Sequence, residues 1–147
     1  MSERLKEAAE AIKETPYVFV YGTLMEGFGN HMYLSDSAKI CNATTHEKYT
    51  MYADGVPFVV KNIPSVNISG ELYKVDHEVL AHNLDTLEGH PDFYRREVVE
   101  VNGDNEKMYE AWLYFYPSEN LAIGRVIPER VVSGSYRKYV LEKWEKW

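Results

Sequence analysis

The sequence predicts an α+β fold, a small mixed β-barrel with a few flanking helices. The first observation is its pattern of six or seven strands, most of them short, with few helices, which is typical of a small closed or nearly closed sheet. The second is its length, since 147 residues fit one domain with a real core. The third is its 12 tyrosines, whose apolar rings and polar tips suit strands and pocket walls.

The first predicted element is a helix over residues 3–14, where apolar residues recur at helical spacing. Pro16 ends it, because the residue before a proline is pushed out of the helical region. We expect residues 1–15 to form an N-terminal helical extension that acts as a lid, a packing strut or a dimer contact. We expect residues 16–147 to form a single domain.

The predicted strands are runs of β-branched and aromatic residues bounded by turn residues. In order, they are Tyr17–Tyr21, one or two strands in Ala38–Tyr52, the short run Pro57–Lys61, Val66–Val75, Tyr94–Val101 and Met108–Tyr116. Gly70 inside the fourth run predicts a bulge or a point of close approach. Residues 135–146 form a predicted closing helix.

A second helix is predicted between the strand Val66–Val75 and the strand Tyr94–Val101. Asp76 is a favourable N-cap, and Gly89 stands where a C-cap belongs. Glu88 therefore falls on the last helical turn, where the negative end of the helix dipole disfavours a carboxylate.

Apolar neighbours Leu84 and Leu87 add a partly desolvated setting, which also raises a carboxyl pKa towards a value useful for proton transfer. The plainer alternative is that Glu88 points into solvent, as most surface glutamates do. Asp85 is a weaker candidate, because it precedes the helix end.

Composition excludes several classes of function. The net charge of −7 argues against nucleic acid or an acidic membrane as a partner. Cys41 stands alone, so there is no disulfide framework and a reducing cytoplasm is the expected location. No apolar segment has the length of a signal peptide or a membrane span. His77 and His82 lie five apart, off a common helical face, so we expect no metal site and no cofactor. Cys41 could act as a nucleophile only if a histidine reached it, and a small buried hydrophobe is the plainer interpretation.

The segment "VFVYGTLMEGFGNH" (residues 18–31) opens from an apolar strand into a long loop with three glycines. It has neither the Gly-Lys-Ser/Thr ending of a P-loop nor the spacing of a dinucleotide-binding turn. Gly22, Gly27 and Gly29 let the backbone approach another group closely, either a ligand or a neighbouring strand. Further along the chain, Tyr94, Arg95 and Arg96 either pair with the acidic residues around position 88 or hold a substrate carboxylate, and ordinary ion pairing is the plainer alternative.

Four motifs follow one another along the chain. They are Tyr-Gly-Thr-Leu (21–24), Gly-Glu-Leu-Tyr (70–73), Leu-Asp-x-Leu-Glu-Gly (84–89) followed by Tyr94-x-Arg96, and Ala-Trp-x-Tyr-x-Tyr (111–116). In this order they resemble the γ-glutamylcyclotransferase family, in particular its branch of γ-glutamylamine cyclotransferase and the plant avirulence-induced proteins. The resemblance runs from about Tyr17 to Tyr136. Near its end, Ser-Gly-Ser-Tyr (133–136) stands where many relatives carry Gly-Asp-Trp.

The resemblance implies a small barrel with its pocket at one mouth and a cofactor-free, cyclising acyltransferase or lyase. Such an enzyme cleaves a γ-glutamyl amine or amide to 5-oxoproline and a free amine. It implies that Glu88 is the acid/base. It also implies that the loop Tyr21, Gly22, Thr23 and Leu24 holds the γ-glutamyl end of the substrate. Tyr94 and Arg96, from the motif that follows Glu88, complete the set of candidate substrate-binding residues.

The alternative is a module on the same fold that binds a small ligand or a protein without turnover, because fold does not fix function. A third reading, acyl transfer through Cys41 or a serine, lacks a nucleophile–base motif. The expected partner is a small γ-glutamyl molecule, and the expected state is a monomer or weak homodimer.

Overall fold

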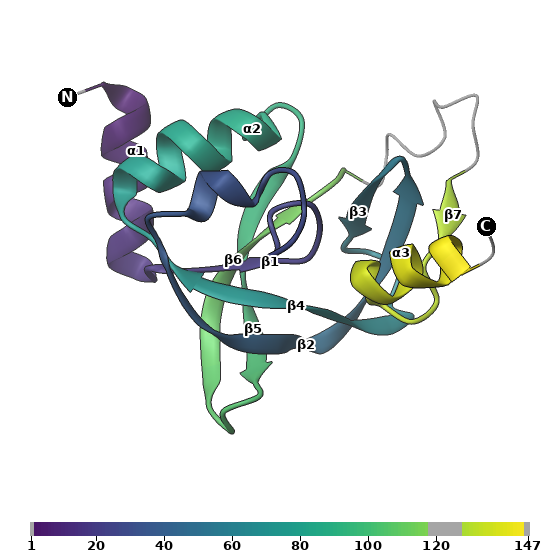
Figure 1. Ribbon diagram of the computed structural model, residues 1–147. Coiled ribbons are helices and arrows are strands. Elements are labelled where there is room, and N and C mark those ends of the chain that lie inside the picture. The colour runs from purple at the N-terminus through teal and green to yellow at the C-terminus, as the bar shows by residue number, and fades with distance from the viewer. Residues whose placement is uncertain (1, 118–127, 146–147) are drawn as a thin grey trace.

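The computed structural model describes residues 2–117 and 128–145, and its centre is a closed barrel of five strands (Figure 1). The barrel strands are β1 (Tyr17–Val20), β2 (Ala38–Asp54), β4 (Val66–Lys74), β5 (Arg95–Gly103) and β6 (Met108–Phe115). They follow the order β2-β4-β1-β6-β5, and β5 pairs back with β2 to close the barrel. Only β1 and β6 are parallel among these pairs, so the predicted mixed barrel is confirmed.

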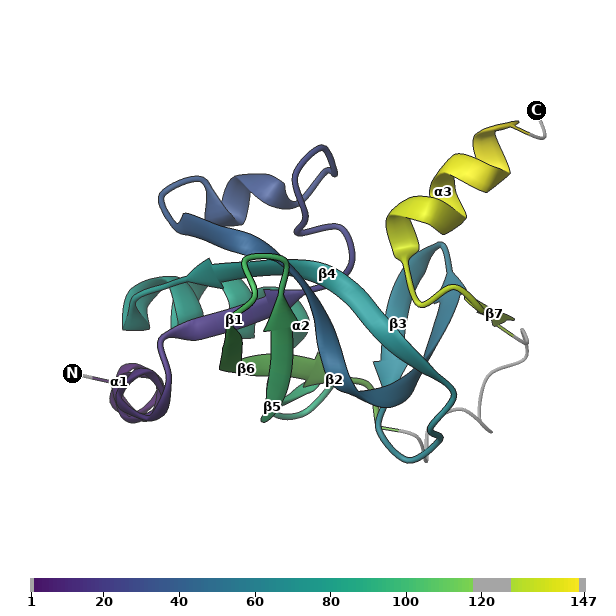
Figure 2. The same ribbon diagram turned by 90° about the horizontal axis from the view of Figure 1, so that it is seen from below.

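Strand β2 belongs to two sheets. Its first half pairs with β4 and β5, whereas its second half pairs with β3 (Val56–Val60) and β7 (Glu129–Arg130). Two register shifts interrupt the ladder with β4, one between Lys39 and Cys41 and one between Thr44 and Lys48, and such irregularities bend a strand. Figure 2 shows β2 leaving the barrel to reach β3. The segment predicted as one or two strands is thus one long strand. The two-residue strand β7 is too short to give a sequence pattern.

The barrel core depends on one close approach between β1 and β4. A Cβ built on Gly70 of β4 would overlap the carbonyl oxygen of Val20 and lie 2.8 Å from Phe19 Cζ. The predicted close approach at Gly70 is therefore confirmed, and its neighbour is the protein's own backbone. Around it, apolar side chains from all five barrel strands are buried together.

Helix α1 (Glu3–Glu14) has the predicted bounds, and the Ser2 hydroxyl accepts a hydrogen bond from the Leu5 N–H at 3.2 Å. It packs on the barrel through Trp112 of β6, whose indole N–H reaches the carbonyls of Ala11 and Thr15 at 3.3 and 3.1 Å. These contacts are those of a packing strut, one of the three roles that the sequence left open for this helix.

The second predicted helix forms as two joined pieces, the π-helix η2 (Val79–Asp85) and one turn of α-helix, α2 (Thr86–Glu88). Asp76 Oδ1 accepts a hydrogen bond from the first N–H of η2 at 2.8 Å, and Gly89 ends α2 with a φ of +68°. Both predicted caps are confirmed.

Two further helical elements complete the described part, the short 3₁₀ turn η1 (His31–Leu34) and the C-terminal helix α3 (Tyr136–Glu145). No helix in residues 2–117 and 128–145 is long and apolar enough to cross a membrane.

Candidate active site

A cavity of about 200 Å³ lies at the end of the barrel where β1 and β6 finish and β5 begins. Separate segments of the chain contribute to its wall. They include the start of the glycine loop (21–24), Pro57 of β3, Glu88 of α2, Tyr94 just before β5 and Tyr114 of β6. The fold thus brings together all but one of the residues that the sequence nominated for the site. The exception is Arg96.

The start of the glycine loop offers backbone donors to this cavity. The carbonyl of Gly22 accepts the N–H of Met25 at 3.0 Å, and the carbonyl of Thr23 accepts the N–H of Asn30 at 3.0 Å. In contrast, the N–H groups of Gly22, Thr23 and Leu24 donate to no acceptor within the described residues. Successive unpaired N–H groups in a turn form a concave anion site. The loop therefore has the donors that a carboxylate needs.

The three loop glycines have different surroundings. A Cβ on Gly22 would lie 2.6 Å from Pro57 Cγ, so the close neighbour of Gly22 is a side chain of β3. Gly27 has a φ of +88°, a conformation that favours glycine. No described atom lies within 4 Å of a Cβ built on Gly29. At Gly29, therefore, no strand of the described chain makes the close approach that was one of the two alternatives.

The far half of the loop is anchored by Glu71, a residue that sequence reasoning did not nominate. Its buried carboxylate accepts hydrogen bonds from the Glu26 N–H and the Tyr73 hydroxyl, both at 2.9 Å. Arg137 of α3 donates to the same carboxylate at 3.2 Å and to the Glu26 carbonyl at 2.6 Å. The only signal in the sequence was the Gly-Glu-Leu-Tyr motif, in which Glu71 is the charged residue.

Glu88 occupies the last position of α2 and lines the cavity. Burial raises the pKa of its carboxyl group from 4.5 to about 7. The sequence-based expectation of a raised pKa is confirmed. Of the two apolar neighbours that the sequence suggested, Leu84 is fully buried, whereas Leu87 is 37% exposed and lies at the cavity rim. The cavity wall adds further apolar surface, which includes the rings of Tyr21 and Tyr94.

The tyrosines near Glu88 remain neutral donors. Burial raises the pKa of Tyr21 and Tyr94, and the negative charge of Glu88 adds to the effect at both. The Tyr21 hydroxyl donates to the Tyr114 carbonyl at 2.9 Å. The Tyr94 hydroxyl makes no hydrogen bond to a described residue, so its donor is available to a ligand in the cavity.

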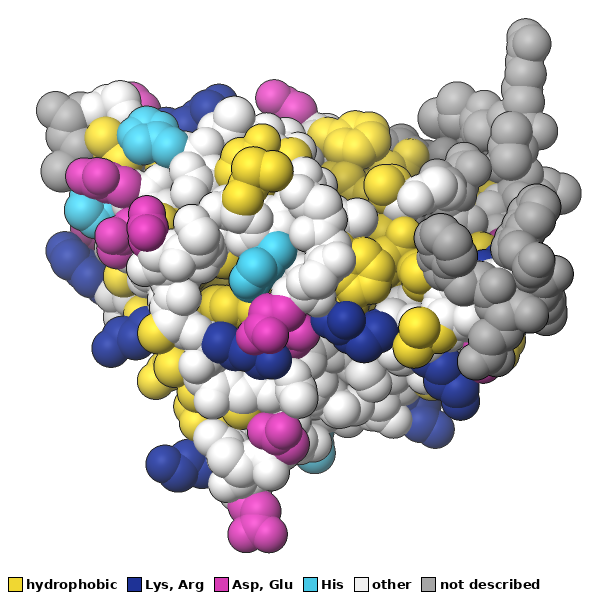
Figure 3. All heavy atoms as spheres, viewed as in Figure 1, with side chains coloured by type: hydrophobic (Ala, Val, Ile, Leu, Met, Phe, Trp, Pro, Cys, Tyr) yellow, Lys and Arg dark blue, Asp and Glu magenta, His cyan; other side chains and the backbone are white. Residues whose placement is uncertain are grey.

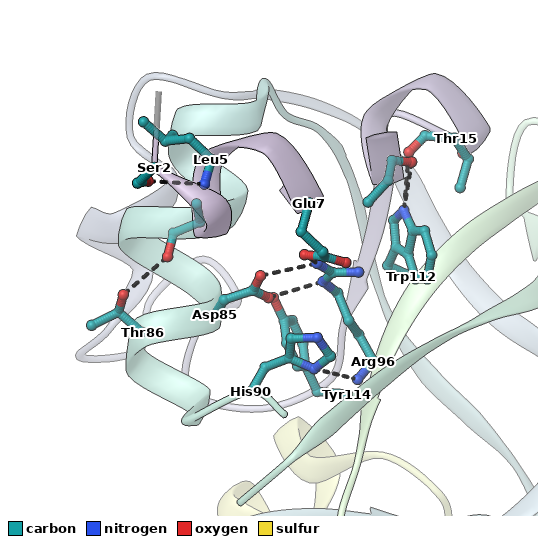
Figure 4. Close-up of polar contacts among 12 residues, drawn as sticks. Ser2, Leu5, Glu7, Thr15, Asp85, Thr86, His90, Arg96, Trp112 and Tyr114 are labelled. Carbon is teal, nitrogen blue, oxygen red and sulfur yellow. Dashed lines mark hydrogen bonds and ion pairs between the residues drawn. The ribbon is translucent and has the colours of Figure 1, made fainter. Parts of the chain in front are cut away.

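Arg96 is buried in an ion-pair network beside the cavity and does not line it (Figure 4). Its guanidinium donates to both oxygens of Asp85, at 3.0 and 3.1 Å, and to Glu7 of α1. The same group stacks on the Trp112 ring, 4.8 Å from its centre. Of the two roles that the sequence left open, the contacts match ion pairing.

Asp85 is the centre of this network, since its carboxylate also accepts a hydrogen bond from the Tyr114 hydroxyl at 2.5 Å. It therefore links the helix that carries Glu88 to β5 and β6. The sequence left Asp85 as a weaker acid/base candidate, but its oxygens are occupied by Arg96 and Tyr114.

Among the described residues, one group of side chains has the arrangement of potential metal ligands, and the guanidinium of Arg96 binds its two carboxylates. Glu7, Asp85 and His90 place ligand atoms within 4.8 Å of one another. However, the Arg96 guanidinium bonds both carboxylates, and His90 Nδ1 accepts the Arg96 backbone N–H at 3.2 Å. The two carboxylates of this group are thus bound to a guanidinium, and the histidine is bound to a backbone N–H.

Comparison with known proteins identifies the family to which the chain is similar. A family model described as "Gamma-glutamyl cyclotransferase, AIG2-like" matches residues 18–138. A protein of Methanocaldococcus jannaschii named "Putative gamma-glutamylcyclotransferase MJ1514" is 48% identical over 124 residues, which are 84% of this chain and 97% of that protein. Gamma-glutamylaminecyclotransferase B of Danio rerio is 38% identical over 114 residues, 67% of this chain and 58% of that protein.

A solved structure supports the same assignment. The crystal structure of an AIG2-like protein from Mus musculus superimposes with a TM-score of 0.64 and 26% identity, covering 77% of this chain and 86% of that chain. The chain therefore belongs to the γ-glutamyl cyclotransferase, AIG2-like family and is an enzyme of the γ-glutamylcyclotransferase type.

Proposed function

We propose that the protein cyclises a γ-glutamyl amine or amide to 5-oxoproline and releases a free amine. One observation carries the proposal: Glu88, with a pKa of about 7, lines the same small cavity as the residues that present three unpaired backbone N–H groups. A module that only binds a carboxylate needs the donors but has no use for a desolvated acid.

The loop donors suit the α-carboxylate of a γ-glutamyl group. In this arrangement, the N–H groups of Gly22, Thr23 and Leu24 receive the carboxylate oxygens. Fixing the carboxylate allows the substrate to fold so that its α-amine faces its own γ-carbonyl. Holding an intramolecular nucleophile in this geometry contributes on the order of 7 kcal/mol to lowering the barrier.

The reaction then needs only proton movement. The α-ammonium gives a proton to the Glu88 carboxylate, and the free amine attacks the γ-carbonyl carbon to form the ring C–N bond. Glu88 gives this proton to the departing nitrogen, and the bond between that nitrogen and the carbon breaks. The ring nitrogen loses its second proton to the Glu88 carboxylate, which passes it to the released amine or to solvent, and the neutral lactam 5-oxoproline remains. A carboxyl group with a pKa near 7 can perform these transfers at neutral pH.

Tyr94 is suited to stabilise the charge that develops on the γ-carbonyl oxygen. Its hydroxyl stays protonated because burial and the Glu88 charge raise its pKa. It also has no hydrogen-bond partner among the described residues and lines the cavity. An unpaired donor placed in advance is the usual means of stabilising such an oxyanion.

The proposal includes a small-molecule substrate, a cytoplasmic location and a monomer or weak homodimer. The net charge of −7 and the single, buried Cys41 support the first two parts.

The Glu88→Gln variant tests the proposed role of the acid. We expect turnover of γ-glutamyl amides to fall by about a hundredfold to ten-thousandfold, the usual contribution of a positioned acid/base. Release of 5-oxoproline measures turnover, and calorimetry with a non-cleavable γ-glutamyl analogue measures binding, which should survive.

Glu78→Gln is the matched control, because Glu78 precedes the same helical segment and is exposed. Asp85→Asn does not serve as a control, since it would break a buried ion pair. Turnover by Glu88→Gln at the wild-type rate would remove the proposed mechanism. A folded wild-type protein that binds γ-glutamyl analogues and cleaves no γ-glutamyl compound would support the binding module.

A further inference from the structure

The mouth of the cavity indicates what the departing amine carries. We propose that the preferred substrate is a γ-glutamyl amide whose leaving amine bears an uncharged, apolar alkyl or arylalkyl chain. This inference rests on the proposed function and adds the chemical class of the leaving group.

Three large hydrophobic side chains meet at the cavity while remaining open to solvent. Val56 is 51% exposed, Leu87 37% and Phe93 53%, and all three line the cavity. They come from β3, α2 and the loop before β5, so the fold gathers them from distant parts of the chain. Figure 3 shows hydrophobic side chains gathered on this face between the places of α2 and β3 in Figure 1. Exposed apolar groups converging on a cavity are typical of a ligand surface.

The cavity encloses only the reacting end of a substrate. Its volume of about 200 Å³ is below the range of roughly 300–1,000 Å³ that is usual for pockets burying a drug-sized ligand. The glutamyl end must reach the loop donors and Glu88, so the departing amine's chain lies towards the rim. The side chains that line the cavity at its rim are Val56, Leu87 and Phe93.

Charge at the cavity favours an uncharged chain. Among the described residues of the cavity wall, Glu88 is the only charged side chain, and it is assigned to proton transfer. A second hollow is lined by three charged side chains, Lys61, Arg95 and Glu97. Lys61 and Glu97 bind each other at 2.6 Å, and Arg95 Nε donates to the Pro91 carbonyl at 3.3 Å. An amino acid as leaving group would bring an ammonium and a carboxylate to a rim whose described lining residues offer no charged partner besides Glu88, and unpaired charges are costly to desolvate.

The rim also has a fixed aromatic surface. The Phe93 ring meets Tyr94 edge-on at 5.1 Å and Tyr116 at 5.6 Å between ring centres. Tyr116 in turn packs against Phe58 at 4.8 Å. Because its neighbours hold it, Phe93 offers a preorganised face on which an alkyl or aryl chain can pack.

A matched pair of substrates tests this inference on the wild-type protein. γ-Glutamyl-n-pentylamide and γ-glutamyl-ε-lysine have the same alkyl chain, but only the second carries an α-amine and a carboxylate beyond it. We expect kcat/KM for release of 5-oxoproline to be at least about tenfold higher for the pentylamide, the scale of discrimination by an apolar pocket. γ-Glutamyl-methylamide serves as the reference substrate, because the single methyl group of its leaving amine is too short to contact the rim.

Variants locate the preference at the rim. Val56→Ser and Phe93→Ser should each lower the ratio of kcat/KM between pentylamide and methylamide severalfold. Met108→Ser is the control, because Met108 is 56% exposed at the other end of β6 and should leave this ratio unchanged. Circular dichroism checks that each variant folds.

The outcomes separate the two proposals. Equal kcat/KM for pentylamide and lysine substrates, or a preference for lysine, would overturn the inference while leaving the proposed function standing. Absence of 5-oxoproline from all three substrates would overturn the proposed function, and this inference would fall with it.

Discussion

Two carboxyl groups three positions apart on one helical segment have different surroundings, and these surroundings decide what each can do. Asp85 accepts hydrogen bonds from Arg96 and Tyr114 and is locked in an ion pair. Glu88 lines a cavity, and burial alone accounts for its pKa of about 7. The acid suited to proton transfer is therefore the one that lacks a cationic partner.

The Glu88 pKa predicts a pH-dependent stability. Between about pH 4.5 and 7, the unfolded chain loses this proton while the folded chain keeps it, so the contribution of Glu88 to the free energy of unfolding falls as pH rises. Glu88→Gln removes this penalty and should be more stable than wild type at pH 8 by about 1–3 kcal/mol. Urea denaturation at pH 4 and pH 8 measures the difference, which should vanish at pH 4. A variant that is less stable than wild type at pH 8 would contradict a desolvated Glu88.

At the scale of elements, the C-terminal helix α3 holds the loop that carries the anion donors. Arg137 bonds the Glu26 carbonyl and the Glu71 carboxylate, and its guanidinium lies 5.0 Å from the centre of the Phe28 ring. Tyr136 packs on Phe28 from the same helix, at 5.4 Å between ring centres. The donors at the start of the loop thus depend on contacts made at its far half.

Arg137→Gln should therefore loosen the loop and weaken substrate binding. We expect KM to rise about tenfold with a smaller change in kcat, because Glu88 and its surroundings are untouched. The fold should survive, since the Arg137 side chain is 45% exposed. Lys138→Gln, at the next and exposed position of α3, is the control. A change in kcat with KM unchanged would show that α3 does not act through binding.

At the scale of the whole molecule, barrel closure and the cavity share the same strands. Phe19 and Val20 of β1 line the cavity on one side and meet Gly70 of β4 on the other. The packing that closes the barrel therefore also sets the position of the glycine loop, which begins directly after β1.

Gly70→Ala should destabilise the protein by about 2–3 kcal/mol, because its Cβ would overlap the Val20 carbonyl and press on Phe19. Thermal denaturation measures the loss. Gly29→Ala is the matched control, since nothing lies near its Cβ position, and it should change stability by less than about 0.5 kcal/mol. Equal stability of the two variants would mean that β1 and β4 can separate at no cost.

The sequence by itself determined the features that depend on neighbours along the chain. Helix α1 and its end before Pro16 follow from periodicity and proline geometry. The caps at Asp76 and Gly89 place Glu88 at a helix end, where the structure has it. The glycine loop was recognisable because a strand ended in a run too long for a simple turn.

Only the tertiary structure decided which distant groups meet. Leu87 was expected to cover Glu88, but it is 37% exposed, and both residues line the cavity whose wall includes Tyr21 and Tyr94. Arg96 looks like a free cation in sequence, yet its partners Glu7 and Asp85 stand 89 and 11 positions away. Glu71 anchors the glycine loop through the Glu26 N–H, which lies 45 positions earlier in the chain. Local propensity acts over a few residues, whereas burial and charge pairing depend on barrel closure, which joins strands that no local pattern relates.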